Sequence, residues 1–369
     1  MTLKNIKKIR VIIGSLNVGG TEKQLLKIIN NLVEKEWKIE VITIKEKGVL
    51  AKYLNKKIKV YNLNIKNNLK FIKFFTILFK LIRIFKKDPT TLTHFFLPQS
   101  YIFGMISSII SNAKCKLIMS RRSLNLYQKK ILFSRTVEKI LHKKVDKILV
   151  NSNAIRKQLI NEEGVSEKKI EVIYNGIKLK KNKKNRTNNN FGIVIIANLI
   201  PYKNHAMLLK ALNNIKKKLP NNWKLYCIGR DDGIKRNLKN LSKKLKIINN
   251  IHWIETLKLE KILINCDLGI LCSKEEGFPN AILEYFSYKL PVISSDVGGC
   301  REIIKNNKNG ILLKKNNYEE LSKAIFYIYK NKKDAKKLGF EGYKTAKKRF
   351  DLNKMIKSHE EEYIKYVKS

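Results

Sequence analysis

The chain is poor in acidic residues. Its 369 residues include 78 Lys and Arg but only 30 Asp and Glu, so the formal net charge is +48. Such a charge predicts an anionic partner, which can be a nucleic acid, an anionic membrane face or a phosphorylated substrate, and the charge alone does not choose among them. Arginine is scarce within the basic set, with 11 Arg against 67 Lys. Because base and phosphate recognition in nucleic acids relies on Arg, we expect no nucleic-acid partner.

Cysteines are few, and their spacing shows no pairing. The five cysteines are odd in number, form no C-x-x-C pair and mostly lie inside apolar runs, so we predict buried free thiols in a reducing compartment. No signal-peptide pattern precedes the first strand-like run. The longest stretch without a formal charge, 89–113, contains Pro98 and several polar residues, which excludes it as a membrane span. These absences predict a cytoplasmic protein.

One segment combines apolar and basic side chains at helical spacing. In residues 69–87, LKFIKFFTILFKLIRIFKK, aromatic and aliphatic residues are interleaved with Lys and Arg. The pattern predicts a basic amphipathic helix, which can lie on an anionic lipid face. On this interpretation the protein is peripheral on the inner face of the cell membrane. The alternative is a helix that covers the core of an α/β domain and keeps its lysines in solvent.

Short β-like runs alternate with helix-length amphipathic segments, which is typical of parallel sheets covered by helices. The alternation stops at 179–190, where apolar residues are almost absent, and then resumes. We therefore predict two doubly wound α/β domains, 1–178 and 191–348, joined by a linker at 179–190, with a C-terminal helix at 349–369 that packs back on the first domain. Ligands are expected in a central cleft that the two domains face, at the carboxyl ends of strands. The expected strands are 9–13, 38–44, 59–63, 92–96, 116–119, 147–151, 170–173, 191–197, 224–228, 251–254, 268–272, 291–295 and 311–313.

Two glycines follow the first expected strand. Gly19 and Gly20 precede a helix that we expect to begin at Thr21, because Thr21 and Gln24 have capping-box spacing. Free backbone N–H groups there would suit a phosphate or a sugar hydroxyl, and the alternative is a purely structural turn. The loop is neither G-x-G-x-x-G nor a P-loop, which argues against dinucleotide binding and NTP hydrolysis.

An acidic pair follows a strand in the second half. Glu276 lies in the loop after 268–272, and Glu284 lies on a helix that we expect to begin near Phe278, with Pro279 in its first turn. In a chain so short of acids, carboxylates at this place suggest acceptors for the hydroxyl groups of a sugar or ribose. The alternative is a solvated acid on an exposed helix.

Several phrases together resemble the family-four retaining glycosyltransferases of the GT-B fold, the group 1 glycosyltransferases. The resemblance covers nearly the whole chain. It implies two Rossmann-like domains, a nucleotide-sugar donor held mainly by the second, an acceptor held mainly by the first, and transfer with retention and without a metal. The phrases are the Glu276 and Glu284 pair with seven residues between, GGTE at 19–22, IYNGI at 173–177, ANLIPYKNH at 197–205 and DVGG at 296–299.

The resemblance also implies roles for particular residues. It places Glu276 near the donor sugar, Glu284 on the ribose hydroxyls and Lys203 on the donor diphosphate. Asn198 stands where the family often has Arg; it can hydrogen-bond a phosphate but brings no charge, so Arg230 is expected to assist. The remaining candidates for donor binding are Gly19, Gly20, Gly277, Phe278, Pro279 and Asn280.

In the first domain the sequence departs from the family. Many members carry two histidines in the cleft, whereas this chain has His94, with Phe96 at the second place. His94 is either a catalytic ligand to the sugar or pyrophosphate, or a hydrogen-bonded strand histidine. Arg121 and Arg122, directly after 116–119, would contact an acceptor phosphate or simply supply surface charge.

The chemistry requires little more than these groups. Cleavage of the anomeric C–O bond builds negative charge on the diphosphate, which a Lys and oriented N–H groups stabilise. The sequence has no D-x-D and no His/Cys cluster with ligand spacing, so we expect no metal and no cofactor. We predict a hexosyltransferase that moves a sugar from a nucleotide-diphosphate sugar to a glycan or lipid-linked acceptor in cell-surface polysaccharide or lipopolysaccharide synthesis. The alternatives are a GT-B-like sugar-nucleotide epimerase, which needs no acceptor, and a basic nucleic-acid-binding protein, which has no need of the acidic pair.

Overall fold

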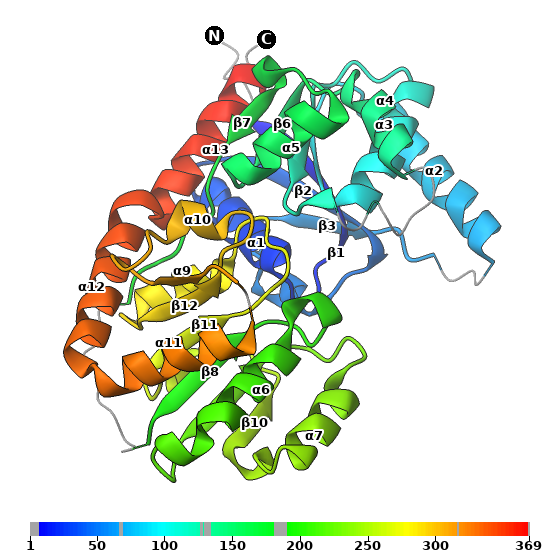
Figure 1. Cartoon of the computed structure of the whole chain (residues 1–369). Helices are drawn as coiled ribbons and strands as arrows, with labels where there is room; N and C mark the ends of the chain where they lie inside the picture. Colours follow the sequence, from blue (N-terminus) through cyan, green and yellow to red (C-terminus); the bar gives the residue numbers. More distant parts are fainter. Residues whose placement is uncertain are drawn as a thin grey trace. The chain divides into compact units, whose positions relative to one another are not determined.

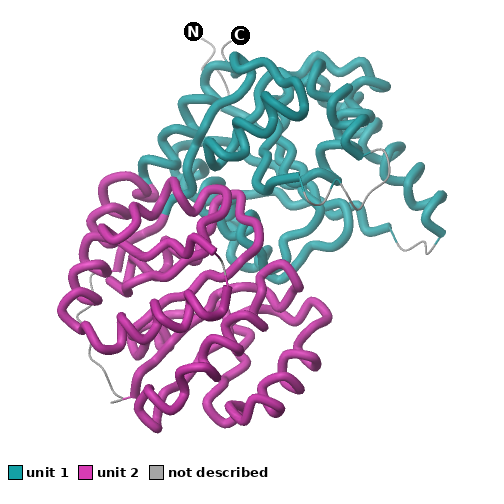
Figure 2. The backbone as a smooth tube through the Cα atoms, in the orientation of Figure 1, with its two compact units in different colours: residues 1–176, 353–369 teal, residues 177–352 magenta. Residues whose placement is uncertain are grey.

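The chain divides into two compact units. The computed structural model describes residues 7–65, 69–125, 128, 134–180, 190–315 and 317–367. One unit contains residues 1–176 and 353–369, and the other contains residues 177–352 (Figure 2). Of the predicted linker at 179–190, residues 181–189 lie outside the described residues.

Unit 1 is built on a parallel seven-stranded sheet in the order β3-β2-β1-β4-β5-β6-β7 (Figure 1). Strands β4 and β5 are buried at every position, which is expected for central strands covered by helices on both faces. The strands are β1 (Lys8–Ser15), β2 (Lys38–Glu46), β3 (Lys59–Asn62), β4 (Leu92–Phe96), β5 (Leu117–Arg121), β6 (Lys147–Val150) and β7 (Ile170–Val172). The helices are α1 (Gly20–Glu34), α2 (Lys70–Lys87), α3 (Pro98–Ile110), α4 (Ser134–His142) and α5 (Asn153–Glu163).

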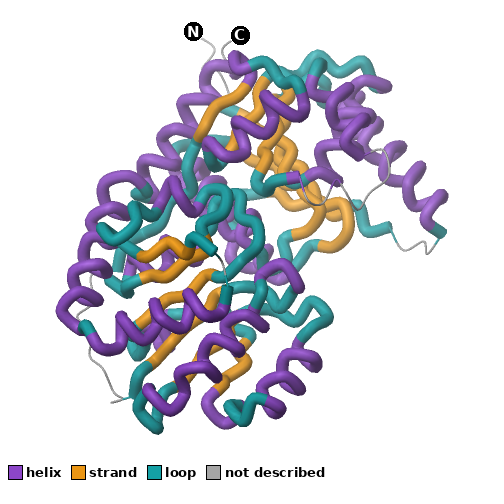
Figure 3. Tube along the Cα trace, viewed as in Figure 1, coloured by secondary structure: helices purple, strands orange, loops and turns teal. Residues whose placement is uncertain are grey.

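Unit 2 contains a parallel six-stranded sheet in the order β10-β9-β8-β11-β12-β13. Figure 3 shows the strands of each unit lying between helices. The strands are β8 (Gly192–Ile196), β9 (Lys224–Ile228), β10 (Ile251–Ile254), β11 (Leu268–Leu271), β12 (Val292–Ser295) and β13 (Ile311–Leu313). The helices are α6 (His205–Ile215), α7 (Lys235–Lys244), α8 (Glu260–Leu263), α9 (Asn280–Ser287), α10 (Cys300–Ile303), α11 (Tyr318–Lys330) and α12 (Lys332–Arg349).

The predicted α/β fold class is confirmed. All thirteen expected strands are present, with ends that differ by no more than two residues from the prediction. In each unit the strand order reverses beside the central strand, between β1 and β4 and between β8 and β11. Doubly wound proteins bind ligands at the carboxyl ends of strands next to such a reversal. Ligands are therefore expected at the loops after these four strands.

The last helix, α13 (Leu352–Val367), returns the chain to unit 1 from residue 353 onward (Figure 2). Its Tyr363 ring packs edge-on against Trp37, with 5.8 Å between ring centroids. Glu360 accepts a hydrogen bond from Trp37 Nε1 at 3.2 Å, and Met355 Sδ accepts one from the Gly176 N–H at 3.0 Å. Unit 1 is thus assembled from both ends of the chain.

The five cysteines are free and buried, as predicted. Burial raises the pKa of the Cys272 and Cys300 thiols to about 12 in each case, so both remain uncharged at neutral pH. In the described part of the chain, no helix is both long enough and apolar enough to cross a bilayer.

Candidate active site

The loops after β8 and β11 meet at the strand reversal of unit 2. Because β8 and β11 are parallel neighbours, their carboxyl ends lie at the same edge of the sheet. The Lys274 N–H donates to the Tyr202 carbonyl at 2.8 Å, and the Cys272 thiol donates to the Lys203 carbonyl at 3.4 Å. These contacts hold the two loops together, and they bring Lys203 and Glu276 side by side across 73 residues of sequence.

Lys203 and Glu276 form a buried ion pair at this edge. Lys203 Nζ donates to Glu276 Oε1 at 2.6 Å, and the two side chains are 16% and 9% exposed. The same carboxylate oxygen accepts a hydrogen bond from Ser273 Oγ at 2.6 Å. Burial by itself lowers the pKa of Lys203, but the Glu276 carboxylate, helped by Tyr202, outweighs burial and raises that pKa. Lys203 therefore keeps its charge inside the site. Ser273 was not predicted as a site residue, although it directly follows the strand expected at 268–272.

A second polar group joins Asn198, Arg230 and Asp232. Arg230 donates from Nε and Nη2 to the two Asp232 carboxylate oxygens at 2.7 and 3.1 Å. Asn198 Nδ2 donates to the same carboxylate at 3.1 Å, and Asn198 Oδ1 accepts from the Arg230 N–H at 3.3 Å. Asp232 thus compensates the charge of Arg230. Asp232 was not singled out from the sequence, so this role was missed.

Helix α9 begins at Asn280, two residues after the predicted start near Phe278, and Pro279 lies before the helix rather than in its first turn. Pro279 precedes the helix with an extended ψ of 104° and offers no side-chain cap. A residue before proline is driven out of the helical region, so Phe278 could not open the helix. The Phe278 side chain is 5% exposed and packs edge-on against Phe350 at 5.5 Å between centroids. Phe278 thus anchors the loop in the core, and the first N–H groups of α9 are left without a side-chain cap.

Gly277 lies where two loops approach closely. The Gly299 N–H donates to the Glu276 carbonyl at 3.2 Å. A Cβ atom on Gly299 would lie 2.1 Å from the Gly277 carbonyl oxygen, and this contact is too short for any side chain. The glycine of the 296–299 phrase is therefore required by the packing of the loop after β12 onto the loop that carries Glu276.

Glu284 lies half-buried on the second turn of α9. Within the described residues, its carboxylate accepts no hydrogen bond and forms no ion pair. Burial, with the charges of Glu260 and Glu284, raises the pKa of Tyr288 to about 12, so the Tyr288 hydroxyl stays protonated beside Glu284. The Glu284 carboxylate can therefore accept hydrogen bonds from the hydroxyl groups of a ligand.

In unit 1, α1 begins at Gly20, one residue before the predicted start, and Gly19 is its N-cap. Thr21 lies inside the helix, where its hydroxyl cannot cap, and Gln24 is 3% exposed. The Glu22 side chain folds back instead: a Cβ on Gly19 would lie 2.1 Å from Glu22 Oε2. A carboxylate in the first turn is favoured by the helix dipole, which agrees with the position of Glu22 against Gly19.

His94 is fully buried in β4. Its Nδ1 lies 2.8 Å from the Tyr363 hydroxyl and its Nε2 lies 2.9 Å from Ser120 Oγ. Burial first, then the charges of His359 and Arg122, hold the pKa of His94 well below 6.5. Both ring nitrogens are engaged inside unit 1, and these contacts favour the interpretation as a hydrogen-bonded strand histidine. The partner Tyr363 is 269 residues away in sequence, so no local pattern could reveal it.

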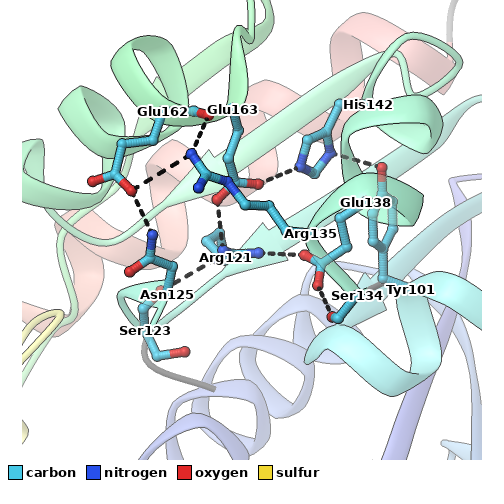
Figure 4. Close-up of polar contacts among 10 residues, drawn as sticks. All are labelled: Tyr101, Arg121, Ser123, Asn125, Ser134, Arg135, Glu138, His142, Glu162 and Glu163. Carbon is cyan, nitrogen blue, oxygen red and sulfur yellow. Dashed lines mark hydrogen bonds and ion pairs between the residues drawn. The ribbon is translucent and has the colours of Figure 1, made fainter. Parts of the chain in front are cut away.

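Both predictions for Arg121 are wrong. The side chain is not exposed, so it can neither bind an acceptor phosphate nor supply surface charge. The side chain is 1% exposed and pairs with Glu138 and, at 2.8 Å, with Glu163 (Figure 4). His142 Nε2 lies 3.0 Å from Glu163, and its Nδ1 lies 2.9 Å from the Tyr101 hydroxyl. Glu138, His142 and Glu163 have potential ligand atoms within 4.8 Å of one another. The Arg121 guanidinium already supplies the positive charge there, so this group does not fit a metal.

Two family models cover the two units. The model described as "Glycosyltransferase Family 4" matches residues 18–181, and the model "Glycosyl transferases group 1" matches residues 177–345. Together the two matches span residues 18–345, which include Lys203, Glu276 and Glu284. The chain belongs to the group 1 glycosyltransferases of the GT-B fold and is a glycosyltransferase.

Relatives and solved structures agree with this family. The chain is 26% identical to the O-antigen biosynthesis glycosyltransferase WbnH of Escherichia coli, over 93% of this chain and 98% of the relative. It is 25% identical to an Escherichia coli UDP-Gal:alpha-D-GlcNAc-diphosphoundecaprenol alpha-1,3-galactosyltransferase, over 85% and 86% of the two chains. The crystal structure of Anabaena HepE in complex with UDP and glucose has the same fold, with a TM-score of 0.82, 19% identity and coverage of 96% and 99%.

Proposed function

We propose that unit 2 binds a nucleotide-diphosphate sugar at the carboxyl edge of β8, β9 and β11, and that the enzyme transfers the sugar to a glycan or lipid-linked acceptor. The observation that carries the donor site is the Lys203–Glu276 pair at the strand reversal. The acceptor class is supported by the relatives, one an O-antigen glycosyltransferase and one that acts on a diphosphoundecaprenol-linked sugar. The product would be a cell-surface polysaccharide or lipopolysaccharide.

The leaving diphosphate is the group that the site must stabilise. Lys203 donates one of its hydrogens to Glu276, and an ammonium group has further N–H donors for phosphate oxygens. A cation in a site shielded from water stabilises developing negative charge more than it would in bulk solvent. In this proposal Lys203 neutralises the diphosphate, while Ser273 and Lys203 hold the Glu276 carboxylate beside the donor sugar.

The nucleoside part of the donor would bind around α9. Glu284 supplies a carboxylate that lacks a partner in the described chain and can accept from the ribose hydroxyls. The start of α9 at Asn280 would bring the positive end of the helix dipole to the phosphates. Arg230 and Asn198 would assist once the donor competes with Asp232 for their hydrogen bonds.

Transfer with retention and without a metal is part of the proposal. It is supported by the family-four resemblance and by the state of the acidic doublet after β9. Asp231 accepts hydrogen bonds from the N–H groups of Gly233 and Lys235 at 2.9 and 3.2 Å, and Asp232 binds Arg230 and Asn198. Both carboxylates are already engaged by the protein's own donors.

The anionic partner of the first domain is proposed to be the inner face of the cell membrane. Helix α2 buries Ile77, Leu81 and Phe85 in the unit 1 core, whereas Phe71 and Phe79 are 74% and 59% exposed. Helix α2 thus covers the core with one face and leaves the other face exposed. The exposed residues beside the phenylalanines include the basic Lys70, Arg83, Lys86 and Lys87. Exposed aromatic rings flanked by basic groups suit an anionic lipid surface.

The donor proposal is tested by thermal unfolding with UDP-, GDP-, ADP- and dTDP-sugars. A ligand that binds only the folded state raises the unfolding midpoint by mass action, so we expect one nucleotide family to stabilise the protein. Donor consumption that requires an added acceptor would then separate transfer from epimerisation. A folded sample that no nucleotide sugar stabilises would contradict the donor site.

A further inference from the structure

Arg121 and Arg122 are neighbours in sequence but lie in opposite electrostatic environments. Arg121 is neutralised by Glu138 and Glu163. Arg122 forms no ion pair with any residue in the described ranges, and no carboxylate contributes to its pKa. A half-buried guanidinium without a counterion is costly in the free protein. The arrangement therefore calls for an anion from outside the chain.

The structure holds the Arg122 guanidinium in place. Its Nη1 donates to Asn175 Oδ1 at 2.5 Å, and Asn175 is 2% exposed. Its Cζ lies 5.5 Å from the centroid of the Phe96 ring. Arg122 directly follows β5, Phe96 ends β4 and Asn175 follows β7, so all three lie at the carboxyl edge of the unit 1 sheet. Nε is buried and has no hydrogen-bond partner.

The ionisable groups that sense Arg122 are uncharged at neutral pH. Burial first, and then the Arg122 charge, hold the pKa of His359 well below 6.5, and the pKa of His94 is likewise depressed. Burial raises the pKa of the Tyr363 hydroxyl. Burial also lowers the pKa of Arg122 to about 10, which still leaves it cationic. One unbalanced positive charge thus remains at this edge of unit 1.

We propose that Arg122 binds a phosphate of the acceptor's diphosphate linkage. The inference rests on the proposed function, because it requires an acceptor that carries phosphate. A guanidinium matches phosphate oxygens with two parallel N–H donors, and most of the donors of Arg122 have no partner in the described structure. The donor diphosphate is assigned to Lys203 and Arg230 in unit 2, so Arg122 gives unit 1 an anion site of its own.

The test uses farnesyl diphosphate as the probe, with farnesol as the uncharged comparison. The affinity of each compound for the protein is measured by calorimetry at moderate salt, with UDP present in excess to occupy the donor site. We expect Arg122→Gln to weaken farnesyl diphosphate binding about tenfold to a hundredfold, the range for loss of a charged hydrogen bond. The control Arg236→Gln removes the same charge from an exposed position on α7 and should change the affinity less than about twofold.

The outcomes separate this inference from the donor proposal. An unchanged affinity in Arg122→Gln, or an equal loss in Arg236→Gln, would overturn the assignment, while UDP binding to the same samples tests unit 2 on its own. If Arg122→Gln weakened UDP binding and left farnesyl diphosphate binding intact, the anion would be the donor's and the assignment would also be wrong.

A measurement on the unmodified protein covers the case in which the variant does not fold. Phenylglyoxal modifies accessible guanidinium groups, and the modified peptides are identified by mass spectrometry. We expect Arg122 to react in the free protein and to be protected by farnesyl diphosphate but not by farnesol. No reaction at Arg122, or equal reaction with and without the lipid, would overturn the proposal.

Discussion

Lys203 Nζ lies 2.6 Å from Glu276 Oε1, although 73 residues separate the two in sequence. The pair joins the loops after β8 and β11, and each partner removes the cost of burying the other's charge. Taking away one member of a buried pair leaves an uncompensated charge. Loss of the Lys203–Glu276 pair should therefore change both the unfolding free energy and the turnover rate, and the two changes can be measured separately.

Replacing Lys203 by Ala should lower turnover about a hundredfold or more, because the diphosphate loses its cation. It should also cost about 2 kcal/mol of unfolding free energy, because the Glu276 carboxylate loses its counterion and keeps only the hydrogen bond from Ser273. Steady-state kinetics and urea unfolding measure the two effects. The double variant Lys203→Ala/Glu276→Gln should recover stability but not turnover. Lys210→Ala, an exposed lysine on α6, is the control. An unchanged rate in Lys203→Ala would remove its assigned role.

Replacing Glu284 by Ala should weaken nucleotide binding about tenfold or more, because the proposed ribose acceptors are lost. Stability should change little, since the carboxylate has no partner among the described residues. Thermal shift with the nucleotide found in the sugar panel measures the loss. Glu255→Ala removes an exposed carboxylate elsewhere in unit 2 and should bind as the wild type does. Equal binding by both variants would show that Glu284 does not contact the donor.

Replacing Arg121 by Met should destabilise the protein by about 3 to 5 kcal/mol, because it leaves Glu138 and Glu163 buried without a counterion. The matched variant is Arg135→Met in the same region (Figure 4). Arg135 is 51% exposed and lies 4.0 Å from Glu162, so its loss should cost less than about 1 kcal/mol. Urea unfolding of both variants measures the difference. Similar values for the two would contradict the structural role of Arg121.

Stability should fall as the pH drops below about 6.5. His94 and His359 have pKa values well below 6.5 in the fold, and that of His205 is lowered to about 4, chiefly by burial. The unfolded chain takes up protons at these residues before the folded chain does, so folding loses about 1.4 kcal/mol per histidine between about pH 7.5 and pH 5.5. Urea unfolding across this range measures the slope, and His205→Gln should reduce it by one histidine. A flat profile would contradict the neutral buried histidines.

Replacing Phe71 and Phe75 by Ser should reduce binding to liposomes that contain anionic lipid about a thousandfold, which corresponds to about 4 kcal/mol for the two rings together. Each exposed ring would lose the free energy of transfer from water into the bilayer, about 2 kcal/mol. Both rings lie on the exposed face of α2, so the fold and donor binding should not change. Phe340→Ser on α12, 47% exposed, is the control. Wild-type protein that fails to sediment with such liposomes at moderate salt would contradict the membrane proposal.

Local patterns in the sequence determined the two parallel sheets and the donor-site candidates. Apolar runs of strand length, separated by amphipathic helical segments, predicted every strand to within two residues, because a buried parallel strand must be apolar on both faces. Glu276 and Glu284 stood out for a related reason, because they follow a strand, where doubly wound sheets expose their ligands. Lys203 was identified only through the resemblance to the family-four glycosyltransferases. Local preference and strand periodicity were therefore sufficient for the sheets but not for the whole donor site.

The tertiary structure decided how neighbouring and distant side chains are paired. Arg121 and Arg122 are indistinguishable by sequence, yet one points into a buried cluster with Glu138 and Glu163 and the other has no carboxylate partner in the described chain. The partner of His94 comes from α13, 269 residues away. The Glu22 side chain lies against Gly19, a contact that the sequence did not indicate. Burial and partnership depend on packing between elements distant in sequence, and no local pattern carries that information.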